Sequence, residues 1–259
     1  MLAELKRILV TVKTYPNPSA KYDETVCTAG IDLATGRLIR LYPVRFRDLP
    51  FIDQFKKWDV IEIEVKHKGS DPRGDTWTPV GDSYTVVDHV GTGCGKPPDW
   101  KERKDLTLPL VTTIEELRPK AEAHECSLGV VRVHGPAILK AVPDPGEWDE
   151  GQRQVVERQQ LFGRSKRPLE RVPWRFMYTF RCSDGCGGHT YQLFDWEAYA
   201  LYRGQLAKKG DPDAAAADVE NQYNVRLGTP SHDVCLFVGT HYLRHAQFSA
   251  IGVFYPPRM

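Results

Sequence analysis

The clearest alternation of hydrophobic and polar residues lies at positions 60–65, where Ile61, Ile63 and Val65 alternate with two glutamates. Residues two apart in a β-strand share a face, so this pattern predicts a strand with one buried face. Further short stretches of this kind occur at positions 7–13, 25–31, 38–42 and 84–90. Several short strands with few helical segments predict a small antiparallel β-barrel over residues 1–92.

The pattern changes after residue 92. Positions 93–110 contain several glycines and prolines followed by a charged run, which predicts a linker loop. Thr112 and Thr113 are each followed three residues later by a glutamate, and this capping-box pattern predicts the start of a helix. Predicted strands at 128–133, 174–180, 190–194, 234–238 and 250–255 are interspersed with predicted helices at 148–162 and after residue 195. Residues 111–259 are therefore predicted to form an α+β domain, and the fold class of the whole chain is α+β.

Composition narrows the class of protein. The chain has 259 residues, of which 41% are hydrophobic and 27% charged, as in ordinary globular proteins. No apolar run approaches the roughly 20 residues that a membrane span requires. The first residues lack the apolar region and cleavage site of a secretory signal. Six cysteines, two of them in one cluster, fit a reducing compartment better than a disulfide framework. We therefore expect a cytoplasmic protein that does not bind membranes.

The net charge of +1 gives no overall attraction for a polyanion, but the positive charges are clustered. The larger cluster lies between residues 153 and 181, and a smaller one lies between residues 37 and 57. Basic clusters in a neutral protein indicate contact with phosphate or nucleic acid, although a solvated surface explains them equally. The predicted phosphate contacts are Arg164, Lys166, Arg167 and Arg175.

Two thiols and an imidazole, those of Cys182, Cys186 and His189, lie within eight positions between two predicted strands. Thiolate and imidazole suit the tetrahedral preference of zinc, so this hairpin is a predicted zinc site. A fourth ligand must come from another segment, and the candidates are Cys126, His124, Cys235, His241 and His245. We prefer His245, because a loop predicted at 239–249 can reach a neighbouring hairpin. A water in the fourth position is the alternative, and it would make the site catalytic.

Two carboxylates, Asp195 and Glu197, follow the hairpin closely in the sequence. Carboxylates near a metal act as general bases or bind a second ion. Residues two apart on a helix do not share a face, however, and Asp195 stands where a helix N-cap is expected. Both residues are catalytic candidates, and capping is the alternative for Asp195.

The segment 13–27 is dense in functional side chains. Lysines there can contact phosphate, and tyrosines can stack on bases. The predicted ligand-lining residues are Lys13, Tyr15, Lys21 and Tyr22.

Three motifs carry a resemblance to a known family. They are KTYPxPSxKYxETVCTAG at 13–30, CxxxCxGH followed by DWE at 182–197, and FVGT followed by GVFYPP at 237–257. Together they resemble the signatures of an uncharacterised bacterial protein family with no settled activity. The resemblance implies that the N-terminal segment and the Cys/His hairpin occur together, which favours a shared site.

These observations favour a nucleic-acid- or nucleotide-binding protein with a zinc-stabilised hairpin and a ligand in the groove between its two halves. Two alternatives from other classes stay open. One is a metal-dependent nuclease or other hydrolase that uses the Cys/His site with Asp195 or Glu197 as base. The other is a protein-interaction module whose zinc is purely structural.

Overall fold

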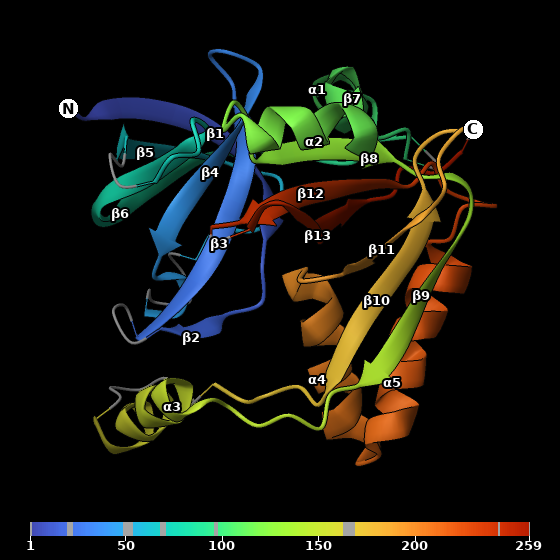
Figure 1. The fold of residues 1–259 in the computed structure, drawn as a ribbon. Coiled ribbons are helices and arrows are strands. Elements are labelled where there is room, and N and C mark those ends of the chain that lie inside the picture. The colour runs from blue at the N-terminus through green and yellow to red at the C-terminus, as the bar shows by residue number, and fades with distance from the viewer. Residues whose placement is uncertain are drawn as a thin grey trace.

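The structure is a computed structural model that describes residues 2–19, 23–48, 54–67, 71–95, 98–162, 169–242 and 244–258. Its N-terminal half is a β-barrel of five strands (Figure 1). These are β1 (Glu4–Lys13), β3 (Asp23–Asp32), β4 (Arg37–Val44), β5 (Asp59–His67) and β6 (Thr76–His89). A short strand, β2 (Asn17–Ser19), pairs with β3, and a 3-10 turn, η1 (Phe46–Asp48), follows β4. The predicted small barrel is confirmed.

The barrel closes because β1 pairs with both β3 and β5, so that the ring runs β1-β3-β4-β6-β5 and returns to β1. Four of the five pairings are antiparallel, as predicted, but β4 and β6 pair in parallel. The reason is geometric. A closed ring with an odd number of strands cannot alternate in direction all the way round, so one neighbouring pair must be parallel.

The alternating pattern in β5 has the predicted orientation. Ile61, Ile63 and Val65 are all buried and belong to the hydrophobic cluster inside the barrel, with Ile8 and Leu41 from neighbouring strands. The interior of the barrel is thus a packed core built from the inward faces of its strands.

The segment predicted as a linker loop contains a helix, α1 (Lys101–Thr107), followed by a 3-10 turn, η3 (Leu108–Leu110). The charged run was part of this predicted loop, yet Arg103 is buried. The Arg103 guanidinium lies 4.6 Å from the ring centroid of Trp58 and donates a hydrogen bond to the carbonyl of Val90. These tertiary contacts stabilise a helix that the local sequence did not indicate, and the position of the domain boundary stays a prediction.

The described residues of the C-terminal half form two sheets and four α-helices. One sheet has the order β13-β12-β8-β7 and the other β11-β10-β9. The strands are β7 (Val111–Thr112), β8 (Leu128–Arg132), β9 (His134–Pro143), β10 (Trp174–Arg181), β11 (His189–Gln192), β12 (Cys235–His241) and β13 (Arg244–Phe254). The helices are α2 (Ile114–Glu122), α3 (Glu150–Phe162), α4 (Trp196–Lys209) and α5 (Pro212–Asn221), with a π-helical turn, η4 (Gln222–Arg226), after α5. The predicted α+β fold class is confirmed.

The helices take distinct places around these sheets (Figure 1). Helix α2 packs over the sheet that contains β8 and β12, while α4 and α5 cover the sheet of β9, β10 and β11. Helix α3 lies against β2 and β3 of the barrel. Within the described residues, no helix is both long and apolar enough to cross a membrane.

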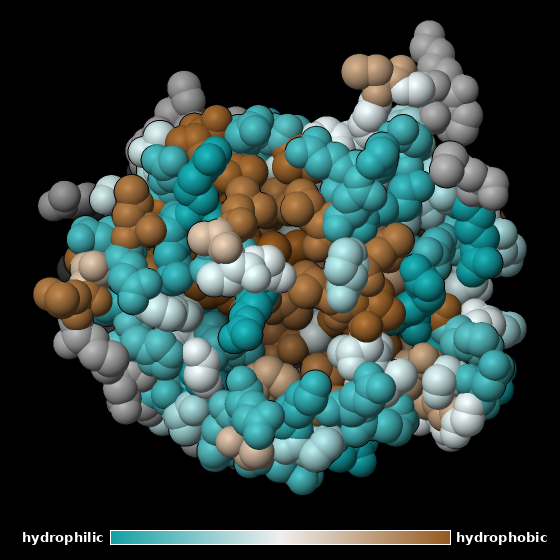
Figure 2. Space-filling model, turned by 90° about the horizontal axis from the view of Figure 1, so that it is seen from above, coloured by the Kyte–Doolittle hydropathy of each residue, from teal (hydrophilic) through white to brown (hydrophobic). Residues whose placement is uncertain are grey.

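The two halves meet in a shared hydrophobic cluster. Its buried members include Leu9, Val12, Ala29 and Ile31 from the barrel and Leu128, Val130, Phe237 and Ile251 from the other half. Arg40, only 4% exposed, also spans the contact and donates hydrogen bonds to the side chain and carbonyl of Ser127. Figure 2 shows hydrophobic residues at the centre of one face of the molecule, surrounded by hydrophilic ones. Packed side chains therefore fill the part of the contact between the halves that the shared hydrophobic cluster covers.

Candidate metal centre

The hairpin of β10 and β11 brings the two cysteines and the histidine together. Phe180 pairs with His189 across the two strands, so the chain leaves and re-enters the sheet at neighbouring points. Within the turn, the amide of Gly188 donates to the sulfur of Cys186. Gly188 has a φ of 99°, a conformation that favours glycine. The glycine-rich sequence thus allows the turn to fold back until both cysteines approach the imidazole.

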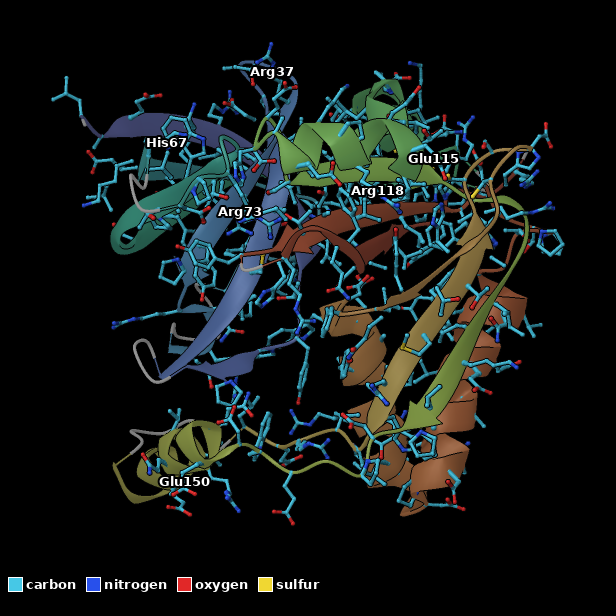
Figure 3. The ribbon with its side chains drawn as sticks, viewed as in Figure 1. Arg37, His67, Arg73, Glu115, Arg118 and Glu150 are labelled. Carbon is cyan, nitrogen blue, oxygen red and sulfur yellow. The ribbon has the colours of Figure 1, made fainter. Side chains whose placement is uncertain are left out.

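A fourth donor comes from helix α2. Thr113 caps this helix, and Glu116 completes the predicted capping box by reaching back to the Thr113 amide. This cap sets the first turn of the helix, from which Glu115 reaches the hairpin (Figure 3). One oxygen of Glu115 lies 3.0 Å from the Cys182 sulfur, and the other lies 3.2 Å from Nε2 of His189.

The four donor atoms form a compact group, all within 4.8 Å of one another. Nε2 of His189 lies 3.4 Å from the sulfur of Cys182 and 3.1 Å from that of Cys186. Zinc bond lengths at tetrahedral angles place neighbouring sulfur, nitrogen and oxygen donors about 3.3–3.8 Å apart. The group of Glu115, Cys182, Cys186 and His189 can therefore hold a metal ion with modest adjustment of its side chains.

Burial distinguishes the four donors. Both cysteines are buried, and the His189 side chain is 9% exposed, whereas the Glu115 side chain is 55% exposed. Burial, together with the hydrogen bond to Glu115, raises the pKa of the Cys182 thiol to about 12. The same hydrogen bond is the main cause that lowers the pKa of Glu115. Without a cation, the Cys182 thiol therefore stays protonated beside the Glu115 carboxylate. A bound divalent metal would favour the thiolate instead, because its positive charge attracts both negative groups.

The preferred fourth ligand, His245, is not part of this group. In place of the predicted loop at 239–249, β12 continues to His241 and β13 begins at Arg244, and these two residues pair. His245 therefore lies within a strand, and its ring packs edge-on against that of His124, with centroids 4.4 Å apart. Glu115 supplies the fourth donor atom of the group instead. It lies 67 residues from Cys182 in the sequence, and the only local signal was the capping box that begins its helix.

Asp195 and Glu197 lie at the other end of the hairpin. Strand β11 runs away from His189, and Asp195 lies six positions further along the chain, up to about 20 Å away. Asp195 caps α4 by accepting from the amide of Glu197, so the capping alternative holds. Lys57 lies 3.3 Å from the Asp195 carboxylate and 3.2 Å from that of Glu197. Both catalytic candidates are thus in a salt-bridge cluster away from the metal group.

Lys13 and Tyr15 connect the barrel to helix α4. The ammonium of Lys13 lies 3.9 Å from the ring centroid of Phe46 and 4.8 Å from that of Trp196. Tyr15 stacks on Tyr199, with ring centroids 4.7 Å apart. These contacts pack the two halves together, and a ligand-lining role for the two residues stays a prediction. The other predicted ligand residues of this segment, Lys21 and Tyr22, lie outside the described residues.

The environment of Lys13 predicts a pH-dependent stability. Burial lowers the pKa of its amine from 10.5 to about 8, against the opposing attraction of Glu197 and Asp195. Between these pH values the unfolded chain binds this proton and the folded chain does not, so folding becomes more favourable as the pH rises. We compare the free energy of unfolding of wild type with that of Lys13→Met. The wild-type value minus the variant value should increase as the pH rises from about 8 to 10.5. Urea unfolding measures it, and a difference independent of pH would contradict the prediction.

The predicted phosphate contacts are only partly described. Arg164, Lys166 and Arg167 lie outside the described residues. Arg175 is exposed near the start of β10, seven residues and therefore up to about 23 Å from the Cys/His turn. Elsewhere in the same basic cluster, Arg171 pairs with Asp144 at 2.8 Å, so part of its charge is balanced locally.

The fold and this group define a two-part α+β protein with a candidate metal centre that joins helix α2 to a β-hairpin. Within that class, the chain belongs to the family described as a domain of unknown function (DUF8757), which matches residues 111–259. Residues 4–109 match a second domain of unknown function, DUF8758. No curated protein matches the chain. The resemblance to a family without an assigned activity is confirmed to this extent, and it supplies no mechanism.

Proposed function

We propose that the protein is a zinc-containing nucleic-acid- or nucleotide-binding protein in which the zinc is structural. The observation that carries the metal assignment is the convergence of two thiols, an imidazole and a carboxylate from helix α2 and the β10–β11 hairpin. Thiolate and imidazole together favour zinc over magnesium or calcium, which prefer oxygen ligands. Four protein donors leave no open position, which is the arrangement of structural zinc sites.

The strand order of the barrel supports a ligand-binding role. A five-stranded Greek-key barrel of this kind is an OB-fold, an architecture that binds oligonucleotides through its second and third strands and adjoining loops. The second and third barrel strands here are β3 and β4. The connection between the first two barrel strands carries Tyr15, one of the predicted ligand residues, and in this architecture that connection contributes to ligand binding.

The contact between the halves restricts where a ligand can bind. Ile31 and Arg40 project outward from β3 and β4 and are buried against the C-terminal half. A ligand in the middle of this contact would displace packed side chains. We therefore place the ligand outside the shared cluster, at its margins, instead of deep between the halves.

The nuclease alternative requires a base beside the metal. Asp195 and Glu197 are at the opposite end of the hairpin and are bound to Lys57, so we do not retain them in that role. A protein-interaction module with structural zinc predicts the same metal content but no affinity for nucleotides. Binding measurements therefore separate it from our proposal.

The test combines metal analysis with binding. Purified protein should contain about one zinc per chain. Fluorescence anisotropy should detect binding to labelled single-stranded DNA, duplex DNA, single-stranded RNA or mononucleotides, and the affinity should fall as salt rises, because phosphate contacts release counterions. Zinc-loaded protein that binds none of these probes at low salt would leave only the interaction module, and protein without zinc would remove the metal assignment.

A further inference from the structure

We propose that the pocket between α2, β11 and β13 binds a nucleoside phosphate, with Arg118 and Arg244 contacting its phosphate. This inference rests on the proposed function and assigns nucleoside phosphates to a separate site of their own. It also differs from that function in location, because the pocket lies beside the candidate metal centre and not in the barrel.

The pocket has the size of a small-molecule site. It is largely open to solvent, and its volume is about 510 Å³, within the range of about 300–1,000 Å³ that is usual for ligand pockets. Helix α2 contributes Arg118, and β11 contributes Tyr191. The rest of the lining is the start of β13, namely Arg244, His245, Ala246, Gln247 and Phe248.

The charge of the lining fits an anion. Arg118 and Arg244 come from different elements, and none of the described residues that line the pocket is acidic. Arginine offers a fork of donors that matches phosphate oxygens in pairs. Nearby, Glu115 directs its carboxylate to Cys182 and His189, so its charge belongs to the metal group. Figure 3 shows Arg118 one helical turn along α2 from Glu115.

Aromatic rings supply the apolar part of the lining. The Tyr191 ring stacks on that of His189, with centroids 5.6 Å apart and an angle of 29° between the planes. Phe248 is buried beneath the pocket, and His124 holds the ring of His245 edge-on. Rigid rings beside cationic groups provide a surface for a nucleobase or ribose next to a phosphate site. Inorganic phosphate would use only the arginines.

Helix α2 and strand β11 each contribute one residue to the pocket and one to the candidate metal centre. Glu115 and Arg118 lie one turn apart on α2, and His189 and Tyr191 lie two residues apart on β11. A metal held by Glu115 and His189 therefore fixes the two elements that carry two of the pocket residues. With α2 and β11 already fixed by the metal, nucleotide binding costs less conformational entropy. We accordingly expect chelation of the metal to weaken nucleotide binding.

The test is calorimetric titration of zinc-loaded protein with 5′-AMP, 5′-GMP, 5′-CMP and 5′-UMP, each compared with its nucleoside and with inorganic phosphate. At least one nucleotide should bind, at least about tenfold more tightly than its nucleoside and than phosphate. The double variant Arg118→Gln/Arg244→Gln should lose at least about tenfold in affinity while keeping its zinc and its thermal midpoint. Arg226→Gln, at an exposed arginine of η4 outside this lining and outside both basic clusters, is the matched control and should bind like wild type.

The outcomes separate the two proposals. If wild type binds nucleotides and the double variant binds them equally well, the pocket is not the site and the proposed function stands. If wild type binds oligonucleotides but no mononucleotide, the inference is overturned as well. If it binds neither, both proposals fail. Should the double variant lose zinc or unfold, Arg244→Gln alone decides, because Arg244 is exposed and lies outside the metal group.

Discussion

Cys182→Ala should release the metal and lower the stability of the protein by about 4 kcal/mol, the contribution expected when free zinc exceeds its dissociation constant a thousandfold. The reason is that three of the four donors lie in one turn, and the loss of a buried sulfur leaves an incomplete tetrahedron. Elemental analysis and urea unfolding, with and without added zinc, measure the two effects. Wild-type protein treated with EDTA should unfold at the same urea concentration as the variant.

Two further variants sharpen this test. Glu115→Ala should keep zinc at reduced affinity, because its side chain is 55% exposed and water can take its place. Cys94→Ala, at an exposed cysteine outside the group, should change neither metal content nor stability. Retention of a full zinc complement by Cys182→Ala would show that this sulfur is not a ligand.

Lys57→Met should lower the free energy of unfolding by about 3–5 kcal/mol, the usual result of removing one partner from a buried ion pair. The Lys57 side chain is 8% exposed and that of Asp195 is 1% exposed, so the carboxylate would be left buried without its cation. Burial alone lowers the pKa of Lys57, but the carboxylates of Asp195 and Glu197 outweigh it and hold the pKa above its ordinary value of 10.5. The stabilisation is therefore complete at neutral pH and declines only as the pH rises through the raised pKa.

The neighbouring lysine provides the control. Lys56 is exposed, and Lys56→Met should alter the free energy of unfolding by no more than about 0.5 kcal/mol. The double variant Lys57→Met/Asp195→Asn should recover part of the loss, because it removes both charges together. If Lys57→Met unfolds at the same urea concentration as Lys56→Met, the ion pair does not join the barrel to α4 as we infer.

Features encoded by neighbouring residues could be predicted from the sequence. The alternation of Ile61, Ile63 and Val65 placed these side chains correctly in the barrel core, because successive residues of a strand face opposite sides. The capping box at Thr113 correctly marked the start of α2, since a cap depends on residues within one turn. The grouping of Cys182, Cys186 and His189 was likewise local, because one glycine-rich turn is enough to bring them together.

The remaining features depend on contacts between distant segments, and only the tertiary structure decided them. The parallel pairing of β4 with β6 follows from closing a ring of five strands, which no single strand encodes. Glu115 joins the metal group, and His245 does not, because α2 packs against the hairpin while β13 starts earlier than its sequence indicated. Asp195 is close to His189 in the sequence, yet an extended strand carries it to Lys57 at the far end. Sequence separation and spatial separation diverge wherever an extended strand or a long-range pairing intervenes. The fourth donor of the candidate metal centre, the salt-bridge cluster and the pocket between α2, β11 and β13 all depend on such pairings.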